Sequence, residues 1–220
     1  KTKFFDVQAF KQIHPYFRIT YAILFYSTIV QFTRVQVVNT MLPLYSQDQL
    51  GYSASTSGLI FTVAGIATFA MIAPTGFISD KIGRKWAAGM AAVSSAIAFI
   101  AFPLATSLPE LMIAAVIVGI ANGLALGAMT IYTYDIVPSH VRGQLQAVRR
   151  SVGELGALTS PPVAGLISAT YSPGVTFWFF APLHVLSAFL IFAIGRESLQ
   201  GKRGENAPST EEIDKGYSPE

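Results

Sequence analysis

A short polar stretch, GFISDKIGRK at residues 76–85, separates two long apolar runs. Gly83 permits a tight turn there, because glycine adopts backbone conformations that are closed to other residues. The carboxylate of Asp80 is suited to cap or face the positive N-terminus of a neighbouring helix. The cations beside it are Lys81, Arg84 and Lys85. The stretch is interpreted either as an ordinary basic loop or as a cluster of opposite charges that holds helices in one arrangement.

Polar side chains also lie within the apolar runs, where an ionisable group is costly and usually faces a cavity or a partner. Ser27, Gln31 and Arg34 follow at spacings of four and three residues, so in a helix they share one face. That face is too polar for lipid and is predicted to point into a helix bundle. Arg34 favours an anionic or strongly polar ligand, with Gln31 and Asn39 as hydrogen-bonding groups. The alternative is that Arg34 pairs with a carbonyl or a carboxylate only for structure.

Two further ionisable residues lie in the later apolar runs. His184 lies midway along the run at 174–195, and an imidazole titrates near neutral pH. Glu154 lies about one turn into the run at 149–170. Each has a structural alternative, His184 as a hydrogen-bonded packing residue and Glu154 as part of helix packing. The ligand-binding candidates are therefore Gln31, Arg34, Asn39 and His184, and the proton-coupling candidates are Glu154 and His184.

Long apolar elements must position these residues. The 220-residue chain is 52% hydrophobic and only 12% charged, whereas soluble domains carry about 25% charged residues. Six apolar stretches are each long enough to cross a hydrocarbon core of about 30 Å as a helix, and they lack the alternation of barrel strands. The predicted fold is an all-α membrane protein with six spans, at roughly 18–43, 54–78, 86–106, 109–134, 149–170 and 174–195.

The basic residues give the spans one orientation. Of the 15 lysines and arginines, all but Arg34 lie near the start of the first span, after the last span, or around the connections after the second and fourth spans. Because basic loops stay on the cytoplasmic side, both termini are expected to be cytoplasmic, in a plasma or inner membrane. Residues 1–17 are interpreted as a linker or an interfacial helix. Residues 196–220 are predicted to be a disordered cytoplasmic tail.

Three stretches resemble motifs of the major facilitator superfamily of membrane transporters. The loop GFISDKIGRK matches the signature between the second and third helices of a six-helix half, at Gly76, Asp80, Lys81, Gly83, Arg84 and Lys85. The stretch YDIVPSHVRG resembles a connection common in the second half of these proteins, at Asp135, Pro138, Arg142 and Gly143. The stretch RRSVGELGALTSPPVAG resembles the Gly/Pro-rich helix of drug/proton antiporters, at Gly156, Pro161 and Gly165, with Ser160 and Ala164 where glycine is usual.

The resemblance implies one six-helix half of a twelve-helix transporter, with an inverted repeat of three and three helices. The connection after the fourth span and the polar tail favour the C-terminal half. The second half would come from the same polypeptide, a separate chain or a second copy. The other expected partners are the lipid bilayer and a small-molecule substrate. The implied mechanism is alternating access, coupled to an ion such as the proton, in an exporter of small organic molecules. An Arg34→Ala variant is then expected to fold but to lose transport.

The resemblance also gives roles to two groups of residues. A cytoplasmic charge cluster would hold one conformation, and its expected members are Asp80, Lys81, Arg84 and Asp135. Small residues let helices approach closely, and proline interrupts their backbone hydrogen bonds. The helix-packing candidates are Gly119, Gly123, Gly127, Gly156, Pro161 and Gly165. The alternative is that these are packing features common to any helix bundle.

The sequence offers no sign of an enzyme. It contains no cysteine, no Walker-type loop, no His-Glu-x-x-His motif and no nucleophile–base pair in a recognisable context. No catalytic residue, metal site, cofactor or nucleic-acid partner is therefore expected. The rival interpretation is a non-transporting structural or assembly subunit of a membrane complex, because six spans alone cannot supply a two-sided cavity.

Overall fold

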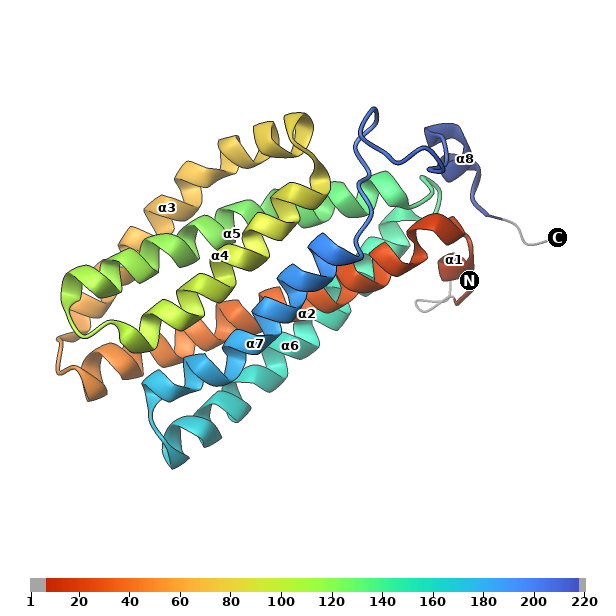
Figure 1. Ribbon diagram of the computed structural model, residues 1–220. Coiled ribbons are helices and arrows are strands. Elements are labelled where there is room, and N and C mark those ends of the chain that lie inside the picture. The colour runs from red at the N-terminus through yellow and green to blue at the C-terminus, as the bar shows by residue number, and fades with distance from the viewer. Residues whose placement is uncertain (1–6, 218–220) are drawn as a thin grey trace.

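The computed structural model describes residues 7–217, and this part of the chain is helical without a strand (Figure 1). A short helix α1 (Val7–Lys11) precedes six long helices, and a second short helix α8 (Thr210–Lys215) follows them. The long helices are α2 (Pro15–Leu44), α3 (Ala54–Lys81), α4 (Arg84–Leu104), α5 (Leu108–Ile136), α6 (Arg142–Thr170) and α7 (Pro173–Ala193). A π-helical turn η1 (Tyr45–Gln49) continues α2.

The six long helices coincide with the six predicted spans. Four of them, α3, α4, α5 and α7, are long and apolar enough to cross a membrane by length and composition. The other two are more polar, since α2 carries Gln31 and Arg34, and α6 carries Arg149 and Arg150. The fifth long helix, α6, begins at Arg142 and not at the predicted residue 149. Arg142, Arg149 and Arg150 therefore lie in the first three turns of α6 and not in a loop.

Serine caps set the starts of three long helices. Ser53 accepts a hydrogen bond from a backbone amide in the first turn of α3, and Ser172 does the same in α7. Ser107 and Glu110 form a reciprocal capping box at the start of α5. These side chains satisfy backbone N–H groups that have no partner within the helix. The caps therefore fix where the chain turns back between long helices.

The long helices follow one another in space in the order α3, α5, α4, α7, α2, α6, each packed against the next (Figure 1). This order is symmetric. Suppose that α2, α3 and α4 exchange places with α5, α6 and α7, in that order. The contact between α3 and α5 then becomes the contact between α6 and α2, and the contact between α4 and α5 becomes the contact between α7 and α2. The contact of α4 with α7 is unchanged. The packing therefore has the symmetry of the predicted repeat of three and three helices.

Glycines allow two of these contacts to be close. A Cβ atom at Gly119 of α5 would meet the backbone carbonyl oxygen of Ala64 in α3. A Cβ atom at Gly123 would lie 2.6 Å from the carbonyl oxygen of Thr68, also in α3. In the equivalent pair, a Cβ atom at Gly156 of α6 would lie 2.6 Å from the backbone of α2. Only residues without a side chain permit this approach.

The other predicted packing residues behave differently. A Cβ atom at Gly127 would make an ordinary contact, 3.7 Å from the Thr75 methyl group. A Cβ atom at Gly165 would meet nothing within 4 Å in the described part of the chain, so the packing role predicted for Gly165 is wrong within this chain. The helix α6 continues through Pro161 without ending.

Gly119→Ala is expected to lower the free energy of unfolding by about 1–3 kcal/mol, because overpacking a close contact displaces backbone. Gly165→Ala is the matched control, since its added methyl group meets open space. Thermal unfolding of both variants in the same detergent measures the difference. Equal stability of the two variants would show that the α3–α5 contact is not close in the membrane protein.

The C-terminal segment is ordered where the structure describes it, contrary to the disordered tail predicted for 196–220. The helix α8 starts with a capping box of Ser209 and Glu212, and the hydrogen bond from the Ser209 backbone amide lowers the pKa of the Glu212 carboxyl. Ile213 is buried in the same apolar core as Leu145. A single buried apolar residue in a polar segment is too weak a pattern for this ordered structure to be predicted from the sequence. Of the predicted interfacial segment 1–17, residues 1–6 lie outside the described residues.

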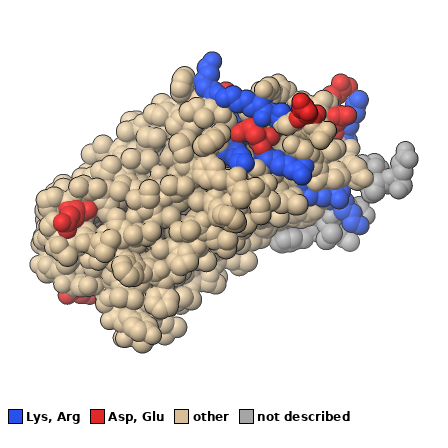
Figure 2. Space-filling view, in the orientation of Figure 1, with Lys and Arg blue, Asp and Glu red and all other residues tan. Residues whose placement is uncertain are grey.

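Charge is distributed unevenly between the two ends of the bundle (Figure 2). In this view the Lys and Arg side chains gather at the end that carries α8 and the α3–α4 connection, and the middle of the surface is uncharged. The opposite end shows only acidic groups among uncharged residues. This asymmetry is what the positive-inside rule leads us to expect of a membrane protein whose basic end is cytoplasmic.

Candidate functional site

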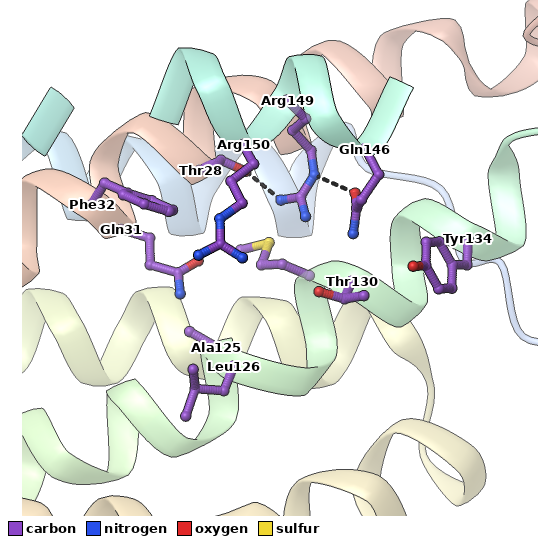
Figure 3. Close-up of a pocket in the computed structure, with 11 residues that line it drawn as sticks. Thr28, Gln31, Phe32, Ala125, Leu126, Thr130, Tyr134, Gln146, Arg149 and Arg150 are labelled. Carbon is purple, nitrogen blue, oxygen red and sulfur yellow. Dashed lines mark hydrogen bonds between the residues drawn. The ribbon is translucent and has the colours of Figure 1, made fainter. Parts of the chain in front are cut away.

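A polar cavity of about 320 Å³ opens between α2, α5 and α6 (Figure 3). It lies where the two most polar long helices meet α5, which explains why those two helices carry polar side chains. The lining residues are Thr28, Gln31 and Phe32 from α2, Ala125, Leu126, Met129, Thr130 and Tyr134 from α5, and Gln146, Arg149 and Arg150 from α6.

Two arginines line the cavity from adjacent positions on α6. Arg149 is only 5% exposed, and it donates hydrogen bonds to Thr28 Oγ1 and, at 3.0 Å, to Gln146 Oε1. These bonds hold its guanidinium group in one orientation. The side chain of Arg150 is exposed and extends into the same space as Gln31 (Figure 3). One arginine is therefore fixed, and the other is available to a ligand.

The cavity is electrostatically one-sided. No Asp or Glu is among the described residues that line it, and no ion pair of the described chain includes Arg149 or Arg150. Two like charges in a site with low-dielectric walls repel each other, and an anion between them relieves that repulsion. The planar guanidinium group also matches a carboxylate in a bidentate geometry. The arrangement is suited to bind a small organic anion.

Arg34 points away from this cavity, into the interior between α2, α4 and α7. It is 2% exposed and donates a hydrogen bond to Ser95 Oγ of α4. Its Nε and Nη2 atoms have no hydrogen-bond partner among the described residues. His184 of α7 is 1% exposed, its ring centroid lies 4.5 Å from that of Phe99, and its Nε2 atom has no hydrogen-bond partner among the described residues. Both predicted residues are therefore enclosed in the interior, and each has polar atoms without a partner in the described part of the chain.

The four predicted ligand-binding residues do not form a single site. Gln31 lines the cavity, Arg34 and His184 lie in the interior, and the side chain of Asn39 is exposed. Residues three apart on a helix point about 60° away from each other, so the neighbouring helices decide which space Gln31 and Arg34 face. Glu154 is exposed on α6 and does not line the cavity.

The arginines of the cavity were missed as ligand groups. The sequence pattern places Arg149 and Arg150 with Arg142 in a basic cytoplasmic connection, and so it does not indicate them as ligand groups. The available signal was the position of the pair directly before an apolar run, where a helix carries them below the membrane surface. Gln146, one turn earlier on α6, strengthens that signal.

A cluster of opposite charges forms at the basic end of the bundle, as the sequence predicted for three of its residues. Arg84 Nε donates to Asp135 Oδ2 at 2.9 Å, and Arg84 Nη1 pairs with Asp80 Oδ1. The pairs join the end of α3, the start of α4 and the last turn of α5. The fourth expected member, Lys81, has an exposed side chain and takes part in no ion pair of the described chain.

Two residues of the C-terminal segment complete the cluster and were not predicted. Glu197 accepts hydrogen bonds from the backbone amides of Arg84, at 2.9 Å, and Lys85, at 3.2 Å. Its carboxylate thus lies at the N-terminus of α4, where the helix dipole favours negative charge. Ser198 Oγ donates to Asp135 Oδ2 at 3.2 Å. The segment after α7 therefore connects α4 to α5 by hydrogen bonds between residues that are far apart in the sequence.

Asp135→Asn is expected to lower thermal stability more than Asp80→Asn. The Asp135 side chain is 27% exposed and joins Arg84 to Ser198, whereas that of Asp80 is 66% exposed and pairs with Arg84, four residues later. An exposed ion pair contributes about 0.2–1 kcal/mol, and a hydrogen bond to a charged group about 1.5–3 kcal/mol. Thermal unfolding of the two purified variants tests this order, and a larger loss in Asp80→Asn would contradict it.

Known proteins share this fold and sequence pattern. The profile of the Major Facilitator Superfamily matches residues 24–215. The chain is 27% identical over 142 residues to the cis,cis-muconate transport protein of Acinetobacter baylyi, covering 64% of this chain and 34% of that protein. It is 28% identical over 169 residues to the multidrug resistance protein MdtG of Salmonella choleraesuis, covering 74% of this chain and 41% of that protein. A crystal structure of a D-xylose-proton symporter superposes with a TM-score of 0.71 at 20% identity, covering 83% of this chain and 49% of that chain.

The chain belongs to the Major Facilitator Superfamily, since the family profile covers most of its length. Its relatives are integral membrane transporters and not enzymes, which agrees with the apolar helices of the bundle. The chain spans less than half the length of the two curated relatives. It therefore corresponds to one half-domain of the family fold.

Proposed function

We propose that the chain is one half of a secondary transporter that moves small organic anions by alternating access. The observation that carries this proposal is the cavity between α2, α5 and α6, in which Arg149 and Arg150 face a space with no carboxylate among its described lining residues. Gln31 and Gln146 add hydrogen-bonding groups on either side. The muconate named for one relative is also an organic acid, which supports this substrate class.

The cavity needs a second wall, since three helices enclose it from one side only. We propose that a second six-helix half provides this wall and places the substrate near the membrane midplane. That half comes from the same polypeptide, a separate chain or a second copy. The charge asymmetry of the bundle supports an orientation with the basic end and both termini in the cytoplasm of a plasma or inner membrane. The ordered polar segment after α7 supports the C-terminal half.

Proton coupling is part of the same proposal. Glu154 lies four residues after Arg150 on α6, so the two side chains share a helix face. The exposed carboxylate of Glu154 is the proposed proton-coupling group, one helical turn from the Arg150 side chain that lines the cavity. His184 is the second proposed group, since it is buried and its Nε2 atom has no hydrogen-bond partner among the described residues. Export, which the antiporter-like motif favours, is the proposed direction.

Uptake into proteoliposomes tests the function. The full-length polypeptide is reconstituted, and radiolabelled muconate is compared with the neutral sugar xylose under an imposed proton gradient. The expected result is saturable muconate uptake that collapses with a protonophore, without xylose uptake. Muconate is one probe of the class, so a panel of mono- and dicarboxylates accompanies it. Fluxes equal to those of protein-free liposomes for the whole panel would favour the rival function, a non-transporting assembly subunit.

A further inference from the structure

An apolar groove of about 490 Å³ lies between α1, α2 and α6, and its lining shares no residue with the polar cavity. Its apolar walls are formed by Phe10, Ile13, Tyr21, Phe25, Val148 and Val152. The Tyr21 hydroxyl group already donates to the Leu145 carbonyl oxygen at 2.9 Å. The walls therefore offer an occupant apolar contact and almost no free polar group.

A cation lies at one end of the groove. Arg18 lines it with an exposed side chain, and the guanidinium group is held by hydrogen bonds from Nε to the Ile13 carbonyl at 3.1 Å and from Nη2 to the Lys11 carbonyl at 2.9 Å. The ring centroid of Tyr217 lies 5.1 Å from it. No ion pair of the described chain includes Arg18 or Lys11. The groove thus combines a positioned, unpaired positive charge with apolar walls.

The depth of the groove fits one class of ligand. Arg18 and Phe25 are separated by about 10 Å along α2, given the rise of a helix. Arg18 belongs to the basic end of the bundle, at the level of lipid headgroups, and Phe25 lies toward the hydrocarbon. Figure 1 shows α1 folded beside the start of α2, at the same end of the molecule. An occupant needs a negative group at one end and about 10 Å of apolar chain below it.

We propose that this groove binds an anionic phospholipid, with the phosphate on Arg18 and an acyl chain along Phe25. Lys11, one residue after Phe10 in α1, adds a second positive charge near the headgroup. Such a lipid site is separate from the substrate cavity, since the two share no lining residue. An extended protein segment is a poorer occupant, since its backbone N–H and C=O groups would find no partners in these walls.

Native mass spectrometry of the full-length polypeptide in detergent tests the site. The probes are dioleoylphosphatidylglycerol and dioleoylphosphatidylcholine, titrated separately at equal concentrations. The unaltered protein is expected to retain the phosphatidylglycerol at least about fivefold better than the phosphatidylcholine for each basic residue that contacts the headgroup. Arg18→Gln is expected to remove most of that preference, and Ala22→Trp, which fills the groove at an exposed lining position, is expected to remove retention with the charge intact.

Lys85→Gln is the matched control, because it removes one positive charge at the same end of the bundle but outside the groove. Its lipid retention should equal that of the unaltered protein. Equal retention of the two lipids would overturn the proposal, because no headgroup would then be selected. A loss in Arg18→Gln without a loss in Ala22→Trp would also overturn it, since the binding would be a surface charge effect without an acyl chain in the groove.

Discussion

Replacing Arg150 with glutamine is expected to weaken binding of an organic anion by about 10- to 100-fold, the effect of losing one charged hydrogen bond. Arg150 is the arginine of the cavity whose side chain is exposed and extends toward Gln31 (Figure 3). Its neighbour Arg149 is already bonded to Thr28 and Gln146, so it cannot replace the lost group without giving up those bonds. The measurement is the concentration of muconate at half-maximal uptake.

Two further variants serve as comparisons, one that keeps the charge at position 150 and one that removes a charge outside the cavity. Arg150→Lys keeps the positive charge but loses the planar fork, so its affinity should fall between those of the unaltered protein and Arg150→Gln. Lys215→Gln removes an exposed charge of α8 that pairs with Glu211 four residues earlier, and its uptake should be unchanged. If Arg150→Gln transports muconate as the unaltered protein does, the cavity is not the anion site.

Arg34→Met is expected to keep or raise thermal stability while it lowers transport at least about tenfold. A buried guanidinium group with two nitrogen atoms unpartnered in the described chain is costly, and an apolar side chain of similar volume is often neutral or stabilising in its place. Ser95 keeps its own hydrogen bond to the Ala91 carbonyl, at 2.7 Å. A charge kept at such a cost points to a role in the transport cycle.

The comparison with alanine separates volume from charge. Arg34→Ala leaves a cavity in the interior, and large-to-small core substitutions cost about 2–5 kcal/mol. The structure thus changes the initial expectation that Arg34→Ala folds normally, because Arg34 is 2% exposed and not at the edge of an open site. Unfolding temperature and uptake are measured on the same preparations. A clear loss of stability in Arg34→Met, with full transport per folded molecule, would show that Arg34 is purely structural.

The fold was largely predictable from the sequence because each part of it has a local cause. Apolar runs long enough to cross a bilayer determine the helices, and Ser53, Ser107 and Ser172 mark three of their starts. The loop GFISDKIGRK, which contains Asp80 and Arg84, carries the signature of the family. The ordered C-terminal segment was not predictable, since Glu197 is held by backbone amides of α4 that are distant in sequence. Such contacts leave no periodic pattern.

The site was predictable only in part. The sequence shows that the faces of Gln31 and Arg34 are polar, but the same helix borders both the cavity and the interior. Which side each residue faces depends on α4, α6 and α7, whose packing order is a property of the whole bundle. The importance of Arg149 and Arg150 was hidden for a related reason: a basic pair near a helix start satisfies the positive-inside rule and a ligand site equally well.

The most direct test of the central claim, that organic anions occupy the cavity between α2, α5 and α6, uses the absence of cysteine from these 220 residues. Leu126→Cys places one thiol in the cavity lining, and Glu205→Cys places one on the exposed segment before α8. Both react with a charged, membrane-impermeant maleimide, and the rates are measured with and without muconate and its carboxylate panel. A transported anion is expected to slow labelling of Leu126→Cys severalfold and to leave labelling of Glu205→Cys unchanged. Labelling of Leu126→Cys that no transported anion slows would contradict it.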